Sequence, residues 1–146
     1  MGTLNLPASG SVYVDTNVII YTVEKIDPYR AILQALWQAS RKGQFKIVSS
    51  ELAILETLVK PRKENNSVLE SAFRQVLFAS HELQLVPVSA SILDMAASLR
   101  ADFGVKPPDA IHAATAISLS CKLFVTNDPF FKRIGGLQTA VLSDVL

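Results

Sequence analysis

The sequence predicts an α/β fold in a single domain (1–146), a three-layer α/β/α sandwich with a central parallel sheet. The first observation is that short apolar stretches alternate with longer segments of helical periodicity along the chain. The second is the composition, 49% hydrophobic and 18% charged, which supplies a core for helices on both faces of a sheet. In sheets of this kind, ligands bind beyond the carboxyl ends of the strands.

Five strands are expected from the apolar stretches. They cover residues 11–14, 45–48, 83–88, 123–125 and 139–142. Helical segments separate the first four of them, and such crossovers are right-handed, so these strands are expected to run parallel.

Helices are expected at residues 18–23, 28–42, 51–60, 64–80, 91–103, 107–120 and 129–134. Asp27-Pro28 predicts an N-cap followed by proline at the first position of the second helix. Ser49 and Ser50 can cap the third helix, and Pro61 is expected to end it because proline breaks helical hydrogen bonding.

The later helices carry similar signals at their ends. Ser89 or Ser91 opens a helix that reaches Phe103, and Gly104 is expected to end it. Pro107 then begins the next helix, where a missing N–H costs nothing.

The composition sets limits on partners and compartment. The net charge is only +1, so any contact with nucleic acid must come from local basic patches. The amino-terminal sequence lacks the order of a signal peptide, and no apolar run approaches the roughly 20 residues that span a bilayer. We therefore expect a cytoplasmic protein. The single cysteine, Cys121, permits no intrachain disulfide and is expected to be a small buried hydrophobe.

Two of the 13 acidic residues follow apolar strands directly. Asp15 ends the strand at 11–14, and Asp128 comes shortly after the strand at 123–125. Both would reach the carboxyl edge of the sheet, where a carboxylate is unfavourable unless something positive meets it. Each also has an ordinary interpretation, Asp15 as a helix N-cap and Asp128 as part of an Asn-Asp-Pro turn.

Two further acids lie on helices. Glu56 falls in an apolar stripe with Leu52, Leu55 and Val59, where a carboxylate must find a partner or shift its pKa. A buried ion pair, or rotation towards solvent, would also account for Glu56. Asp109 lies in the first turn of a largely apolar helix, a place where the helix dipole alone favours an acid.

Together the four acids predict a metal site. Two come from strand ends, and two come from helices that can lean over the same edge of the sheet. Clustered carboxylates repel one another unless a cation lies between them. Oxygen donors without a set of cysteines or histidines favour Mg²⁺ or Mn²⁺ over zinc.

The chain contains four motifs in this order: VYVDTNVII, SSELAILETLVKP, PPDAIHAATAI and LFVTNDPFF. The ordered set resembles the PIN-domain nucleases, and in particular the VapC-type toxins of toxin–antitoxin pairs. The resemblance extends from about Val12 to Leu142. It implies a PIN-like fold and a magnesium- or manganese-dependent endoribonuclease, commonly a homodimer, that a small antitoxin protein inhibits by covering the cleft.

The resemblance also assigns roles to residues. The catalytic, metal-binding acids of the family fall on Asp15, Glu56, Asp109 and Asp128. The polar neighbours that would position these acids or a water molecule are Thr16, Asn17, Thr126 and Asn127.

Basic residues beside three of the acids are expected to position RNA phosphates, although a solvated surface would explain each of them as well. These residues are Lys60, Arg62, Lys63, Lys106, Lys132 and Arg133. Attack of an activated water on phosphorus, with the 3′ oxygen leaving, would give 5′-phosphate and 3′-hydroxyl ends.

Other residues near the motifs have two interpretations each. His112, three residues after Asp109, is expected to be a packing residue or a partner behind the acids rather than a catalytic group, because a carboxylate–metal site does not need an imidazole base. Phe130 and Phe131 would be core residues or a platform for base stacking. Residues 67–78 are apolar enough for a dimer or antitoxin contact, or for ordinary packing.

Two other functions compete with the nuclease. A haloacid-dehalogenase-like phosphatase would use Asp15 as its nucleophile, but it needs a second aspartate at the position of Asn17. A catalytically inactive PIN-like module could bind RNA or protein, but it would have no reason to keep four carboxylates beside RNA. Specific binding of Mg²⁺ or Mn²⁺ separates the enzyme from the inactive module.

Overall fold

The computed structural model describes residues 2–146 and contains a five-stranded parallel sheet in the order β3-β2-β1-β4-β5. The strands are β1 (Ser11–Val14), β2 (Lys46–Ser50), β3 (Leu83–Val86), β4 (Leu123–Thr126) and β5 (Thr139–Val141). Val12 of β1 pairs with Ile47 on one side and Leu123 on the other, so β1 is the central strand.

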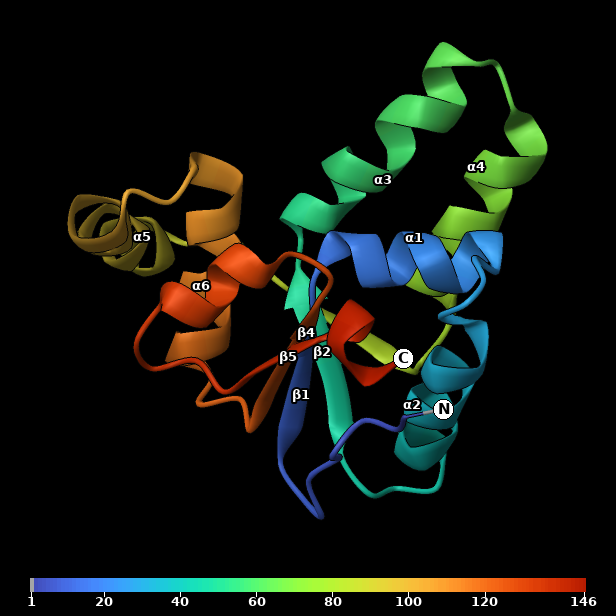
Figure 1. Ribbon diagram of the computed structural model, residues 1–146. Coiled ribbons are helices and arrows are strands. Elements are labelled where there is room, and N and C mark those ends of the chain that lie inside the picture. The colour runs from blue at the N-terminus through green and yellow to red at the C-terminus, as the bar shows by residue number, and fades with distance from the viewer. Residues whose placement is uncertain (1) are drawn as a thin grey trace.

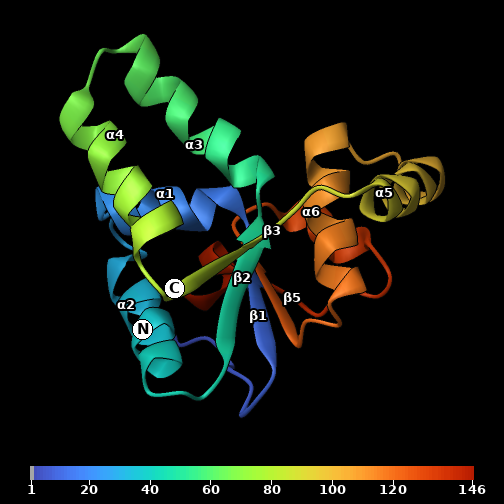
Figure 2. The ribbon, with the colours of Figure 1, turned by 180° about the vertical axis from the view of Figure 1, so that it is seen from behind.

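Helices cover both faces of this sheet, which confirms the predicted sandwich (Figures 1 and 2). The helices are α1 (Thr16–Glu24), α2 (Arg30–Arg41), α3 (Leu52–Lys63), α4 (Ser67–Arg74), α5 (Ala90–Phe103) and α6 (Pro107–Ser118). A π-helical turn, η1 (Gln75–Ala79), extends α4, and two 3₁₀ turns, η2 (Pro129–Arg133) and η3 (Leu142–Val145), flank β5. No helix within residues 2–146 has both the length and the apolar character needed to cross a membrane.

Two hydrophobic cores lie on opposite faces of the sheet. One contains side chains of α1, α2, α4 and η1, among them Ile19, Leu36 and Phe73. The other contains side chains of α5 and α6 together with Tyr13 and Phe124 from the sheet. Alternate residues of β1 therefore enter different cores, as the pleat of a strand requires.

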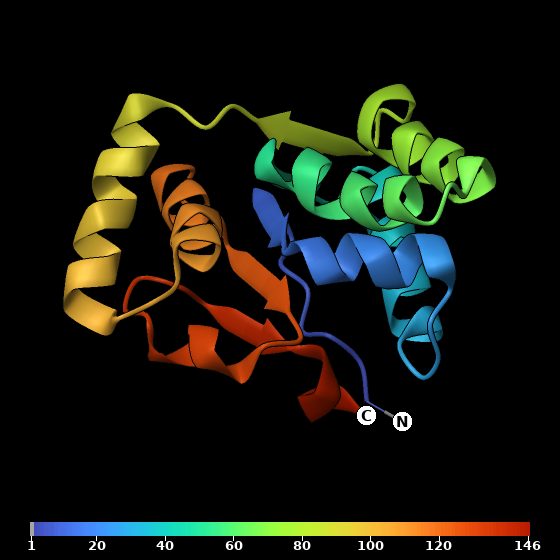
Figure 3. The same cartoon turned by 90° about the horizontal axis from the view of Figure 1, so that it is seen from above.

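The carboxyl edge of the sheet is the upper edge in Figure 1, and Figure 3 looks onto it. α1 starts directly after β1, α3 after β2, and η2 after β4. α6 runs back towards the start of β4, so its first turn lies at the same edge. This arrangement brings segments far apart in the sequence to one place.

The predicted start of the second helix at Asp27-Pro28 is wrong. Residues 26–29 form a turn in which the Tyr29 N–H donates to the Ile26 carbonyl at 3.1 Å. Tyr29 occupies the N-cap position of α2, and its carbonyl accepts the first helical hydrogen bond from Leu33. The turn supplies its own backbone bonds, so no side-chain cap from Asp27 is needed.

The predicted end of the third helix at Pro61 is also wrong, because α3 continues to Lys63. Pro61 lacks one N–H, yet its ring is buried and its carbonyl accepts a hydrogen bond from Asn66 at 2.8 Å. A proline one turn from a helix end removes a single hydrogen bond, which burial of its ring can offset.

The long helix predicted at residues 64–80 is broken at its beginning. Residues 64–66 connect α3 to α4, and the Asn66 side chain caps α4 by accepting from the Leu69 N–H at 3.0 Å. A continuous helix would have paired the Leu69 N–H internally, but here the Asn66 side chain satisfies it at the start of a new helix. The chain therefore turns between α3 and α4.

The predicted apolar stripe around Glu56 is rotated in the structure. Leu55 and Val59 are 63% and 47% exposed, whereas Ala53 and Leu58 are buried. Glu56 therefore lies at the border of the buried face of α3 rather than within it. The sequence offered two faces of similar hydrophobicity, and contacts with α1 and α6 decided between them.

Cys121 lies half-buried before β4 and packs against the second core. Burial raises the pKa of its thiol to about 11, so the thiol stays protonated near neutral pH. Cys121 is less buried than predicted, but it has the character of an inert thiol.

Candidate active site

Asp15 ends β1 and caps α1, so the cap predicted as its ordinary role is present. Oδ1 accepts from the Thr16 N–H at 2.8 Å, and Oδ2 accepts from the Thr126 hydroxyl at 2.8 Å. The residue is only 7% exposed. Burial raises the pKa of Asp15, although the charge of His112 and these hydrogen bonds oppose the rise. A buried carboxylate held in this way favours a nearby cation.

Thr126 joins Asp15 to Asp128 across the edge of the sheet. Its hydroxyl donates to Asp15 and accepts from the Asp128 N–H at 3.1 Å. Asp128 caps η2, where its Oδ1 accepts from the Phe130 N–H at 3.0 Å. The predicted turn at Asp128 therefore exists, and it fixes the second strand-end acid close to the first.

Glu56 reaches this edge from α3. Its Oε1 accepts from the Thr16 hydroxyl at 2.7 Å and lies 2.7 Å from Nε2 of His112, which comes from α6. Burial alone would raise the pKa of Glu56, but the hydrogen bond and charge of His112, with Thr16, outweigh it and lower the pKa. Glu56 is therefore ionised near neutral pH.

Asp109 lies in the first turn of α6 and faces the other acids. Burial raises its pKa, and the charges of Asp15 and Asp128 raise it further. The half-buried Asp109 carboxylate thus lies within electrostatic reach of the two strand-end acids. The structure brings all four predicted acids to one edge of the sheet, from β1, α3, α6 and the β4–η2 connection.

The donor chemistry of this site fits a hard divalent cation. All four acids offer oxygen, and their mutual repulsion at Asp109 would be relieved by positive charge. Within residues 2–146, no group of three or more His, Cys, Asp or Glu side chains is placed so that it forms a cage that could hold a metal ion by itself. Magnesium does not need such a cage, because it keeps several waters and binds through one or two carboxylates together with substrate phosphates.

A family model named PIN domain matches residues 12–137, most of the chain. The chain belongs to the PIN-domain family. The matched region includes both strand-end acids and both helical acids, together with β2, β3, β4 and all of β1 except Ser11.

Solved structures share this PIN fold. The VapBC2 complex of Rickettsia felis bound to promoter DNA has a chain 20% identical, with a TM-score of 0.71, covering 90% of this chain and 98% of that one. A toxin–antitoxin complex from Klebsiella pneumoniae is 24% identical, with a TM-score of 0.65 and coverage of 90% and 97%. VapC20 of Mycobacterium tuberculosis, a sarcin–ricin loop cleaving toxin, is 15% identical, with a TM-score of 0.63 and coverage of 77% and 86%. Among curated proteins, no significant sequence match is found.

The basic residues beside the PIN-domain acids are mostly engaged with neighbouring groups. Lys60 pairs with Glu24 at 3.3 Å, Arg62 pairs with Glu70 at 3.4 Å, and Lys132 pairs with Asp144. The Arg133 guanidinium lies 5.1 Å from the centroid of the Phe130 ring. Lys63 and Lys106 form no ion pair within residues 2–146. Exposed ion pairs of this kind are weak, so a phosphate can compete for their cations.

The four polar residues predicted to position the acids do not all contact them. Thr16 and Thr126 bond directly to the acids, as described above. Asn127 points away, donating to the Tyr21 hydroxyl at 3.3 Å and accepting from the Ser143 N–H at 2.9 Å. Oδ1 of Asn17 is buried and has no hydrogen-bond partner among residues 2–146. Through its two hydrogen bonds to Tyr21 and Ser143, Asn127 joins the end of β4 to α1 and η3.

The two aromatic residues of η2 have different environments. Phe131 is buried against Phe124, with ring centroids 4.7 Å apart, and Ile134 is buried in the same core. Phe130 is partly buried and lies under Arg133. Core packing therefore accounts for Phe131 fully and for Phe130 in part.

Sequence reasoning missed Tyr13, and it predicted His112 as either a packing residue or a partner behind the acids. The Tyr13 hydroxyl lies 2.6 Å from Nδ1 of His112, and both side chains are almost completely buried. A tyrosine in an otherwise apolar strand was the available signal, because a buried hydroxyl needs a partner.

Proposed function

We propose that this PIN-domain protein is a metal-dependent endoribonuclease and the toxin of a toxin–antitoxin pair. The observation that carries the proposal is the meeting of Asp15, Glu56, Asp109 and Asp128 at the carboxyl edge of the sheet. A protein that only binds RNA gains nothing from carboxylates whose charges raise one another's pKa beside a polyanion. The similarity in fold to toxin chains, including one named for cleaving the sarcin–ricin loop, supports the same conclusion.

Each acid has a distinct part in the proposed site. Asp15 and Asp109 would hold a divalent ion, Mg²⁺ or Mn²⁺, with Glu56 and Asp128 as further ligands or acting through water. Such an ion would supply the charge that acidifies a water molecule and stabilises the leaving oxygen. Thr16 and Thr126 orient the carboxylates, and Lys63 and Lys106 offer free cations to RNA phosphates.

Cleavage of RNA under defined metal conditions tests the proposal. Purified protein is incubated with labelled structured and single-stranded RNAs in Mg²⁺ or Mn²⁺, and the ends of the products are analysed. We expect 5′-phosphate and 3′-hydroxyl ends, since water attack does not require the 2′-hydroxyl, and loss of cleavage in EDTA.

Two results would contradict this function. Ends with a 2′,3′-cyclic phosphate would exclude attack by water. Absence of cleavage together with absence of specific Mn²⁺ binding, measured by calorimetry, would favour the inactive binding module instead.

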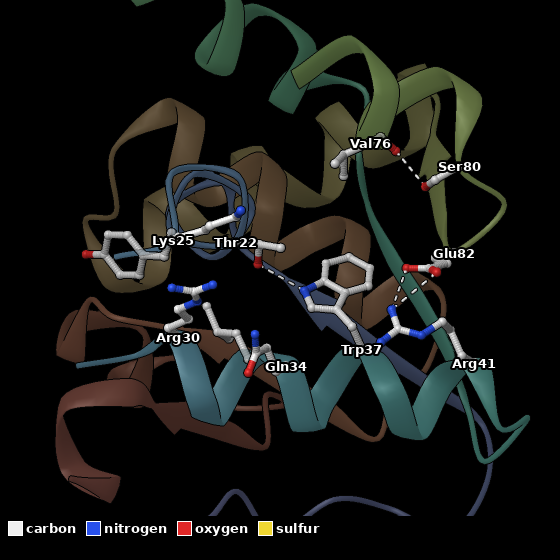
Figure 4. Close-up of a pocket in the computed structure, with 11 residues that line it drawn as sticks. Thr22, Lys25, Arg30, Gln34, Trp37, Arg41, Val76, Ser80 and Glu82 are labelled. Carbon is white, nitrogen blue, oxygen red and sulfur yellow. Dashed lines mark hydrogen bonds and ion pairs between the residues drawn. The ribbon is translucent and has the colours of Figure 1, made fainter. Parts of the chain in front are cut away.

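A pocket beside the C-terminal half of α1 suits an antitoxin segment. It has a volume of about 230 Å³ and lies between α1, α2 and η1, with Leu33, Trp37 and Val76 among its lining residues. Lys25 and Arg30 lie at one end and the Arg41–Glu82 ion pair at the other (Figure 4). Trp37 is only 4% exposed and satisfies its N–H on the Thr22 hydroxyl at 2.9 Å, so its ring forms an apolar part of the pocket wall.

The charge of the pocket indicates which segment it would take. Lys25 and Arg30 have no acidic partner within residues 2–146. We therefore propose that an antitoxin inserts apolar side chains over Trp37 and places acidic groups opposite Lys25 and Arg30.

Charge reversal tests this assignment. With a co-purified antitoxin, Arg30→Glu is expected to weaken binding by about tenfold, because it sets like charges against each other at the pocket. Lys42→Glu, at the end of the same helix but outside the pocket, is the matched control. Equal affinity in the two variants would place the antitoxin elsewhere.

Exposed apolar side chains on α3 and α4 support a homodimer. Leu55, Val59 and Val68 are 63%, 47% and 80% exposed. α3 and α4 project from the rest of the molecule (Figure 1), and apolar surface of this kind marks interaction sites. Light scattering should give twice the chain mass of 15.9 kDa, and a monomer at all concentrations would contradict the dimer.

A further inference from the structure

A chain of hydrogen bonds runs from the core of the protein to Glu56. The Tyr13 hydroxyl lies 2.6 Å from Nδ1 of His112, and Nε2 of the same ring lies 2.7 Å from Oε1 of Glu56. Tyr13 belongs to β1, His112 to α6 and Glu56 to α3. Tyr13 is fully buried and His112 is 1% exposed, so water cannot substitute for either partner.

The direction of these hydrogen bonds follows from the groups themselves. Oε1 of Glu56 accepts from the Thr16 hydroxyl, and Nε2 of His112 lies 2.7 Å from the same carboxylate oxygen, so Nε2 is the donor between the ring and Glu56. On the other side of the ring, Nδ1 lies against the Tyr13 hydroxyl, which can donate to a neutral ring and accept from a charged one. The hydroxyl thus fixes the orientation of the ring in which Nε2 faces Glu56.

The donors converge on one oxygen of Glu56. Oε1 receives the Nε2–H of His112 and the hydroxyl of Thr16, both at 2.7 Å. Among residues 2–146, no donor reaches Oε2 within hydrogen-bond distance. One oxygen of the carboxylate is therefore held, and the other is left without a protein partner.

We propose that Tyr13 and His112 are positioning residues, which together with Thr16 hold Oε1 of Glu56 and leave Oε2 as the oxygen offered to a divalent cation. The inference rests on the proposed function, because it assigns the purpose of Glu56 within that site. Tyr13 and His112 are buried, so neither side chain is placed to touch RNA or the reacting phosphate. They act through the carboxylate, as partners behind metal ligands generally do.

Ordinary packing does not require this arrangement. Both ring nitrogens of His112 are engaged by specific side chains, Nδ1 by Tyr13 and Nε2 by Glu56. The network joins residues 99 and 56 positions apart in the sequence, from a strand and two helices. Hydrogen bonds of this kind fix an orientation that hydrophobic contacts alone leave free.

The hydrogen-bonded chain from Tyr13 through His112 to Glu56 is called the relay below. Nuclear magnetic resonance of the histidine nitrogens tests this relay without any assay of activity. The chain has two histidines, and the exposed His81 serves as an internal reference. We expect the Nε2 proton of His112 to exchange slowly and the Nδ1 resonance to shift in Tyr13→Phe. An Nδ1–H tautomer of His112, or exchange as fast as that of His81, would overturn the relay.

Metal affinity tests what the relay does for Glu56. His112→Ala is expected to weaken Mn²⁺ binding by about 10- to 100-fold, the usual cost of removing a partner behind a ligand. His112→Gln keeps an N–H donor and should recover most of the affinity, and Tyr13→Phe should lose less than His112→Ala. His81→Ala, the matched control, should bind like the wild type.

The outcomes separate the relay from the proposed function. Wild-type affinity in a folded His112→Ala protein would overturn the positioning role. If that variant fails to fold, wild-type affinity in Tyr13→Phe together with poor affinity in His112→Gln would do so. A wild-type protein that binds no Mn²⁺ and cuts no RNA would overturn both the proposed function and the role of Oε2, while the slowly exchanging proton would still report the relay as a structural feature.

Discussion

Asp15→Asn is expected to reduce RNA cleavage by about 10³-fold while leaving the fold intact. The amide has the shape of the carboxylate but no charge for a divalent cation, and loss of about 4 kcal/mol of transition-state stabilisation corresponds to this factor. Asn can still accept from the Thr16 N–H, and its amide can donate to Thr126. Single-turnover cleavage in Mg²⁺ or Mn²⁺ measures the loss.

Stability should respond in the opposite sense to activity. Burial raises the pKa of Asp15, so the folded protein holds this charge at a cost that a neutral amide avoids. In EDTA the variant should therefore melt no lower than the wild type. Added Mn²⁺ should raise the melting temperature of the wild type but not that of the variant, because only the wild type binds the ion.

A matched acid makes the comparison specific. Asp102→Asn removes an exposed carboxylate from α5 that is not one of the four acids of the site, and it should leave both cleavage and the Mn²⁺ response unchanged. Wild-type cleavage by Asp15→Asn would show that the Asp15 carboxylate is not needed for catalysis. A large loss of stability in that variant would mean that the carboxylate serves mainly as the cap of α1.

The sequence predicted those parts of the molecule that depend on local pattern. The five strands and their parallel direction follow from apolar stretches separated by helices, and the structure confirms them. Asp15 and Asp128 could be placed at one edge because a strand delivers its last residue to a known position. The caps at Asn66 and Tyr29, in contrast, depend on turn geometry that the residue types alone did not specify.

The rotation of α3 and the role of His112 depend on contacts between segments that are distant in the sequence, so the sequence alone could not predict them. Helical spacing placed Glu56 within an apolar stripe, but packing against α1 and α6 set the rotation of α3 and left Leu55 exposed. From the sequence, His112 was either a packing residue or a partner behind the acids, and its neighbours on α6 could not decide between these two roles. Its role became visible when Tyr13 and Glu56, from β1 and α3, met it in space.

Phe124→Ala is expected to destabilise the protein by about 3–5 kcal/mol, the usual cost of emptying a buried aromatic site. Phe124 is 1% exposed and stacks on Tyr13 with ring centroids 5.1 Å apart and planes 3° apart. On its other side it contacts the Phe131 ring at 4.7 Å. The variant would leave both rings facing a cavity, and unfolding in denaturant measures the loss.

Phe78→Ala is the matched control, since Phe78 is 52% exposed and should lose no more than about 0.5 kcal/mol. The Phe124 variant should also affect the site at temperatures where it remains folded. Without its stacking partner, the Tyr13 ring is free to tilt and its hydroxyl to leave Nδ1 of His112, so Mn²⁺ affinity should fall as in Tyr13→Phe. Full stability in Phe124→Ala would show that the core collapses around the missing ring. Full metal affinity in a destabilised variant would show that the hydrogen bond to His112, and not the stack, holds Tyr13 in place.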